Sequence, residues 1–200
     1  MLGPGDAGGV MRGLGSILAA VVALAAAAAA QSAAQTDVHA IFDQAERDAR
    51  VGLARKTMPV DVRPAAAGEV VVTVIAGEGK ETESPPAQPG DMVVRNRCPA
   101  TGNEEILITA AKFAERYQGP VGPADAAGWR PYRPRGVEMR YLVVRDSDGT
   151  FIFPAPWSEP IVARPGDAIV RSPEDPADTY RIAAAAFACT YEIVQPAPRS

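Results

Sequence analysis

Residues 89–95 read Pro-Gly-Asp-Met-Val-Val-Arg, and residues 165–171 read Pro-Gly-Asp-Ala-Ile-Val-Arg. The likeness extends to both sides, so that residues 83–117 align with residues 159–191, with two residues deleted from the second loop. Thirteen aligned positions are identical, and this indicates an internal duplication. Positions that both copies keep are those that the local fold needs, whereas positions that differ are free to serve function.

The shared Pro-Gly-Asp predicts the same tight turn in both copies. Proline fixes φ at the second place of a type II turn, and glycine allows the positive φ of the third place. We expect the aspartate that follows to accept hydrogen bonds from the backbone of the turn. The turn residues are Pro89, Gly90, Asp91, Pro165, Gly166 and Asp167. An alternative use of the repeated charges is a pair of equivalent charged pockets, formed by Glu83, Asp91, Glu159, Asp167, Arg95 and Arg171.

Each turn is followed by a short strand, a loop, a second strand and a short helix. Ile106 and Ile108 alternate as the residues of a half-buried strand do. The helix of each copy carries a phenylalanine and a tyrosine four residues apart, which places both rings on one face. This order of elements is similar to that of bacterial proteins named for a PGDYG motif, although Met92-Val93 and Ala168-Ile169 stand where that motif has Tyr-Gly. The resemblance implies a module shape and no particular reaction.

The remaining segments complete an α+β fold. The spacing of apolar residues over 37–56 predicts one amphipathic helix that packs on a core or on a partner. Residues 68–75 are rich in valine and predict a strand, and strands at 139–145 and 150–153 flank a hairpin turn at 146–149. We therefore predict two tandem antiparallel β units related by a pseudo-twofold, each closed by a short helix. The units are residues 68–117 and 137–193, preceded by a helix and linker at 35–67 and joined by a Pro/Gly-rich linker at 118–136.

The first 34 residues predict export. Arg12 precedes an uncharged, alanine-rich run that ends in small residues, as in a secretory signal peptide. A membrane anchor is the alternative, but so short a run barely spans a bilayer. We expect cleavage after Ala30 or Ala34, which leaves no stable membrane span and a periplasmic or secreted protein. The formal net charge of −4 and the pI of about 5.1 give no general reason to bind nucleic acid.

The two cysteines, Cys98 and Cys189, are expected to form one disulfide, because an even pair in an oxidising compartment usually does. Cys98 lies in the loop of the first copy and Cys189 in the terminal helix of the second, so the bond would tie the copies together. The alternative is two unrelated thiols.

Several common chemistries are missing from the sequence. His39 is the only histidine, and we expect it to decorate the leading helix rather than to serve a catalytic triad. A pattern like the start of a calcium loop begins at Asp146, but its twelfth place is Trp157 instead of the required glutamate. We predict no catalytic residue, no metal and no cofactor.

One segment of the linker is typical of a recognition surface. Its arginines and aromatic rings could stack on an anionic or sugar-like ligand, and its prolines would hold them extended. The alternative is a strap in which the rings pack against the two copies. The candidate ligand-binding residues are Trp129, Arg130, Tyr132, Arg133 and Arg135.

These observations favour a non-catalytic exported protein that binds a small molecule or a protein partner in the bacterial envelope. One alternative is an enzyme that uses carboxylates and arginines at the interface between the copies. Another is a structural envelope component that self-associates through its leading helix.

Overall fold

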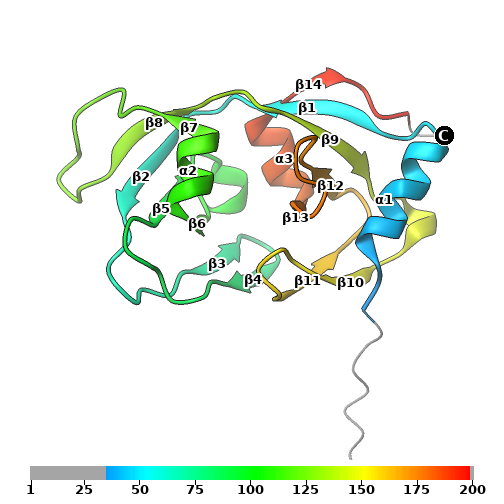
Figure 1. The fold of residues 1–200 in the computed structure, drawn as a ribbon, viewed down its shortest axis with the longest axis horizontal. Helices are drawn as coiled ribbons and strands as arrows, with labels where there is room; N and C mark the ends of the chain where they lie inside the picture. The colour runs from blue at the N-terminus through cyan, green and yellow to red at the C-terminus, as the bar shows by residue number, and fades with distance from the viewer. Residues whose placement is uncertain (1–34, 199–200) are drawn as a thin grey trace, which may run out of the picture. The chain divides into compact units, whose positions relative to one another are not determined.

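A computed structural model of the chain describes residues 35–198, so the signal peptide expected at residues 1–34 lies outside the described part (Figure 1). Within that part the fold is mixed, with antiparallel strand pairing throughout and three α-helices, and the predicted α+β class is confirmed. No helix among these residues is long and apolar enough to cross a membrane.

The first five-stranded sheet has the order β6-β5-β2-β8-β7. Its strands are β6 (Glu105–Ile108), β5 (Met92–Asn96), β2 (Val60–Pro64), β8 (Arg130–Pro134) and β7 (Tyr117–Gln118). The second has the order β13-β12-β9-β1-β14. Its strands are β13 (Thr179–Ile182), β12 (Ala168–Arg171), β9 (Glu138–Val143), β1 (Gly52–Lys56) and β14 (Tyr191–Gln195).

Each sheet contains a strand from the other half of the chain. Strand β1 comes first in the chain, yet it pairs with β9 and β14 in the second sheet. Strand β8 precedes β9 directly, yet it pairs with β2 and β7 in the first sheet. The chain therefore passes from one sheet to the other twice through short connections, between β1 and β2 and between β8 and β9.

Two small hairpins lie next to each other beside the sheets (Figure 1). One joins β3 (Val72–Ile75) to β4 (Gly79–Glu83), and the other joins β10 (Phe151–Pro154) to β11 (Pro160–Ala163). Strand β4 contacts β11, so the hairpins form a common wall.

The helices cover the sheets and define the cores. Helix α1 (Val38–Arg47) covers one face of the second sheet, where Phe42 packs with Leu142 and Ile169. Helix α3 (Ala184–Thr190) covers the opposite face through Phe187. Since both faces are covered, all of β12 is buried. Helix α2 (Ala110–Arg116) covers the first sheet in the corresponding way through Phe113.

The two Pro-Gly-Asp turns have the same backbone shape and the same hydrogen bonds. Gly90 and Gly166 have φ of 92° and 93°. The carboxylate of Asp91 accepts from the N–H of Gln88 at 2.8 Å and of Ala110 at 3.1 Å. In the second copy, the carboxylate of Asp167 accepts from Arg164 at 2.8 Å and from Ala184 at 3.0 Å. Each aspartate thus ties its turn to the start of the helix of that copy.

We expect Gly90→Ala to lower the free energy of unfolding by about 1–2 kcal/mol, because a residue with a side chain is strained at this positive φ. The added Cβ would also lie 3.3 Å from the Cβ of Ala110. Gly90→Asn should cost less, since asparagine tolerates such backbone angles better. Urea unfolding of the two variants checks the order, and equal losses would contradict the backbone argument.

The predicted helix over 37–56 is too long. The helix ends at Arg47, Ala49 adopts a φ of 55°, and the chain then enters β1. Pairing of β1 with β9 on one side and with β14 on the other supplies backbone hydrogen bonds that outweigh the helical preference of these residues. The predicted strand over 68–75 is shortened to β3, which begins at Val72.

The predicted hairpin over 139–153 is wrong. Strand β9 pairs with β1 and β12, while β10 pairs with β11. Between β9 and β10 lies the short 3₁₀ helix η2 (Asp146–Asp148). The turn sequence favours a hairpin, but β9 lies inside the second sheet with residues of both faces in hydrophobic cores, and its pairing partners there are β1 and β12. The expected linker at 118–136 also contains a strand, β8.

Candidate functional site

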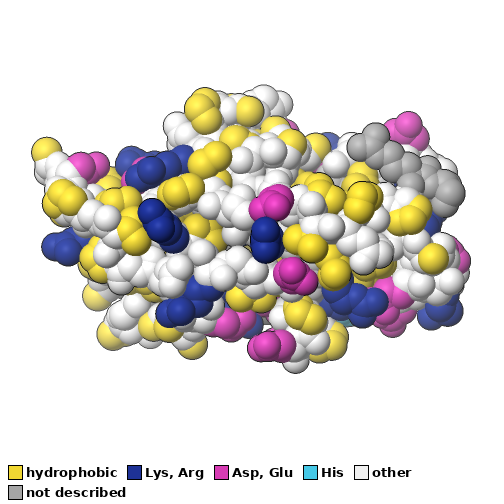
Figure 2. All heavy atoms as spheres, turned by 90° about the horizontal axis from the view of Figure 1, so that it is seen from above, with side chains coloured by type: hydrophobic (Ala, Val, Ile, Leu, Met, Phe, Trp, Pro, Cys, Tyr) yellow, Lys and Arg dark blue, Asp and Glu magenta, His cyan; other side chains and the backbone are white. Residues whose placement is uncertain are grey.

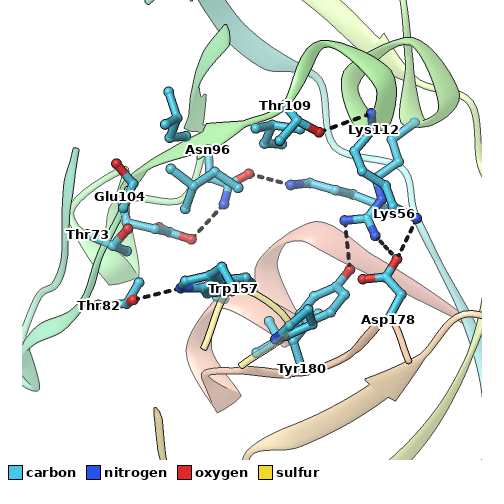
Figure 3. Close-up of a pocket in the computed structure, with 18 of the residues that line it drawn as sticks. Lys56, Thr73, Thr82, Asn96, Glu104, Thr109, Lys112, Trp157, Asp178 and Tyr180 are labelled. Carbon is cyan, nitrogen blue, oxygen red and sulfur yellow. Dashed lines mark hydrogen bonds and ion pairs between the residues drawn. The ribbon is translucent and has the colours of Figure 1, made fainter. Parts of the chain in front are cut away.

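A pocket of about 520 Å³ opens between the two sheets and the wall of hairpins (Figure 3). Both copies line it: helix α2 and strand β6 from the first, and β13 and α3 from the second. Its apolar lining includes Ile75, Ile106, Met139, Trp157, Ile161 and Ile182. This size falls within the range of about 300–1,000 Å³ that is usual for small-molecule sites.

Helix α2 supplies two cations to the pocket. Lys112 and Arg116 lie one turn apart, and both bind the carboxylate of Asp178, from Lys112 Nζ at 3.1 Å. Arg116 also donates to the hydroxyl of Tyr180 at 3.3 Å. Burial acts to lower the pKa of Arg116, but the neighbouring Tyr180 and Asp178 outweigh it and raise the pKa. These contacts join α2 of the first copy to β13 of the second and leave Asp178 saturated by cations.

A series of hydrogen-bonded polar side chains begins at Lys56, the last residue of β1. Lys56 Nζ donates to the Oδ1 of Asn96 at 2.5 Å and to the hydroxyl of Tyr117 at 3.2 Å. The Nδ2 of Asn96 donates in turn to Glu104 at 2.7 Å, and Glu104 also accepts from the hydroxyl of Thr101. Asn96 and Glu104 are buried. The network therefore fixes the amide of Asn96 with its oxygen towards Lys56.

Tyrosine hydroxyls surround the same end of the pocket. Tyr117 and Tyr191 occupy the same place in the two copies, and each stacks on its helix phenylalanine, with ring centroids 5.3 Å and 5.1 Å apart. Burial first, and then the neighbouring Tyr180 and Tyr117, raise the pKa of Tyr191 well above its ordinary value. Tyr191 therefore stays protonated at neutral pH.

The pocket lining also contains a largely buried acidic group. This group is Glu81, and burial raises the pKa of its carboxyl group even though Arg181 works in the other direction. The side chain of Arg181 is 1% exposed and binds Glu81 at 2.6 Å, Asp167 at 2.8 Å and Glu78 at 2.6 Å. At the rim, the indole of Trp157 donates to Thr82 at 3.2 Å. Arg181 thus carries the positive charge that Glu81, Asp167 and Glu78 share.

The structure does not bring the candidate ligand-binding residues of the linker to this pocket. Trp129 is buried against Val71 and Val93, with the guanidinium groups of Arg63 and Arg95 5.1 Å and 4.2 Å from the ring centre. Tyr132 packs edge-on against Phe113. The exposed arginines of the segment lie elsewhere: Arg130 and Arg133 on β8, and Arg135 against the carbonyl of Ala114. Ligand binding by this segment stays a prediction.

The predicted disulfide is confirmed. Cys98 and Cys189 are bonded, with their Cα atoms 5.8 Å apart. The bond joins the start of the 3₁₀ helix η1 (Pro99–Thr101) to α3, next to the pocket. His39 is exposed on α1, and the described residues contain no group of three or more His, Cys, Asp or Glu that could hold a metal ion.

Sequence reasoning missed the cations of the pocket, although Asp91, which it named, also lines it. A comparison of the two copies contains the signal, because Lys112 and Arg116 stand where the second copy has Ala186 and Thr190. These are positions that the shared fold does not require. Lys56 has no such signal, since it lies outside the aligned copies.

Figure 2 shows one face of the molecule on which acidic and basic side chains are interspersed with hydrophobic ones.

Comparisons with protein-family models, curated proteins and solved structures found no match to this chain. The function is therefore inferred from the pocket and its residues.

Proposed function

We propose that this protein is an exported, non-catalytic binding module of the bacterial envelope, and that its ligand occupies the pocket between two tandem repeats related by a pseudo-twofold. The observation that carries the proposal is the pocket of about 520 Å³, which is lined mainly by hydrocarbon and also by hydrogen-bonded polar groups from both copies. Such a combination is typical of ligand sites.

Three features support the pseudo-twofold. The two sheets have corresponding strand orders once β1 is matched to β8. The Pro-Gly-Asp turns make the same hydrogen bonds. The helices α2 and α3 present the same stacked pair of rings. Periplasmic or secreted localisation is supported by the leader-like sequence before residue 35 and by the disulfide, because disulfides persist mainly in oxidising compartments.

Binding is favoured over catalysis because the repeated carboxylates are engaged by other groups of the protein. Asp91 and Asp167 hold their turns, Glu83 pairs with Lys80 at 2.7 Å, and Glu159 accepts from the backbone of Glu83 at 2.7 Å. Binding is also favoured over self-association through α1. The apolar side chains of that helix, Val38, Phe42 and Ala45, are buried in the core of their own chain.

The test is binding of a neutral apolar dye, N-phenylnaphthylamine, whose fluorescence rises in an apolar site. We expect Ile106→Trp to weaken this binding about tenfold or more, because the larger ring fills the pocket. Ile193→Trp is the matched control, since Ile193 is exposed on β14 and does not line the pocket. No binding by the native protein, or equal loss in both variants, would refute the proposed function.

A further inference from the structure

Lys56 differs from the other cations of the pocket. Lys112 and Arg116 bind Asp178, and Arg181 binds three carboxylates. Among the described residues, no carboxylate lies within ion-pair distance of Lys56, whose two hydrogen-bond partners are both neutral. A half-buried ammonium without a counter-ion is costly unless an anion compensates it.

The hydrogen bonds leave donors free at this point. An ammonium group has three N–H donors and no acceptor. Two of the N–H donors of Lys56 bind Asn96 and Tyr117, and the third has no acceptor among the described residues. Since Tyr117 accepts from Lys56, its own hydroxyl hydrogen is also available. An anion beside Lys56 could therefore accept from two adjacent donors.

The nearest carboxylate of this network, Glu104, does not take that place. The side-chain amide of Asn96 lies between Glu104 and Lys56. The two carboxylate oxygens of Glu104 accept from Asn96 and from Thr101. Its effect is to orient the amide of Asn96, which in turn holds Lys56 Nζ in position. Charge-assisted hydrogen bonds to a preorganised ammonium are stronger than those between neutral groups.

We propose that Lys56 binds the carboxylate of an apolar monocarboxylate ligand, whose hydrocarbon part fills the rest of the pocket. This inference rests on the proposed function. A single anionic charge is preferred because Lys56 is the one lining cation, among the described residues, that lacks an anionic partner. The isoleucines, Met139 and Trp157 provide the apolar surface for the hydrocarbon.

The experiment displaces N-phenylnaphthylamine from the native protein with decanoate, decanol or decylamine, which share a chain length and differ in charge. We expect decanoate to displace the dye at a concentration about tenfold lower than decanol, since hydrogen bonds to charged groups contribute more than neutral ones. Decylamine should be the weakest. Lys56→Met should abolish the preference for decanoate, whereas Lys80→Met, at an exposed lysine outside the pocket, should keep it.

The outcomes separate the two proposals. If the native protein does not bind the dye, the proposed function fails. If it binds the dye but decanoate and decanol displace it equally, or decylamine displaces it best, the pocket stands and the assignment of a carboxylate is wrong. If the preference survives Lys56→Met, another group holds the anion. The comparison of ligands on the native protein does not depend on how the variants fold.

Discussion

Replacing both cysteines of the Cys98–Cys189 disulfide by alanine is expected to lower the free energy of unfolding by about 4 kcal/mol. The bond closes a loop with a sequence separation of 91 residues, so its loss frees a long segment of the unfolded chain. The conformational entropy that the unfolded chain gains when the bond is lost grows slowly with loop length and is large for a loop of this size. The midpoint of urea unfolding should fall accordingly.

Reduction of the native protein before unfolding provides the control, because it removes the bond without changing the sequence. It should destabilise the protein by a similar amount. Thiol counting on the denatured, unreduced protein should find no free thiol. Unchanged midpoints after reduction would show that the disulfide does not contribute to stability.

Arg181→Met is expected to destabilise the protein by about 3–5 kcal/mol, because removing one partner of a buried ion pair leaves the other charge uncompensated. Arg181 is buried and binds Asp167, Glu81 and Glu78 together. Methionine preserves most of the side-chain volume, so the loss reports on charge and hydrogen bonds. Urea unfolding at neutral pH measures it.

Arg164→Met is the matched control. Arg164 binds the same Glu78 at 2.8 Å, but its side chain is 45% exposed. Exposed ion pairs contribute about 1 kcal/mol or less, so this variant should stay close to the native protein. Similar losses in the two variants would contradict the role assigned to burial.

The deficit of Arg181→Met should also depend on pH. Burial raises the pKa of Glu81, and Arg181 opposes that rise. Without Arg181, the pKa of Glu81 in the folded state rises further, while the pKa of Glu81 in the unfolded chain stays at its ordinary value. The folded variant then holds a proton that the unfolded chain has lost, so its stability falls as pH rises through this window. We therefore expect the difference in free energy of unfolding between Arg181→Met and the native protein to shrink as the pH is lowered from 7 to about 5.

Local features of the fold could be predicted from the sequence. The two Pro-Gly-Asp turns depend on contacts between residues close in the chain. The conformation of each turn follows from the φ restriction of proline and the φ freedom of glycine. The disulfide could also be predicted, because the chain has one possible pair of cysteines.

The candidate site could not be predicted in the same way. Trp129 and Tyr132 have the composition of a recognition surface, but the structure places them against the first sheet. The sequence predicts a helix at Lys56, yet this residue ends strand β1 and lines the pocket. The charged residues meet there only because α2 of one copy faces β13 of the other.

The sequence by itself determined the two Pro-Gly-Asp turns and the pair of cysteines that forms the disulfide, since the turns depend on local geometry and the disulfide on the single pair of cysteines available. The tertiary structure alone decided that β1 and β8 cross into the sheets of the opposite halves and that a pocket remains between the copies. The physical reason is that strand pairing and burial are satisfied by residues far apart in the chain, and such pairings leave no periodic pattern in the sequence.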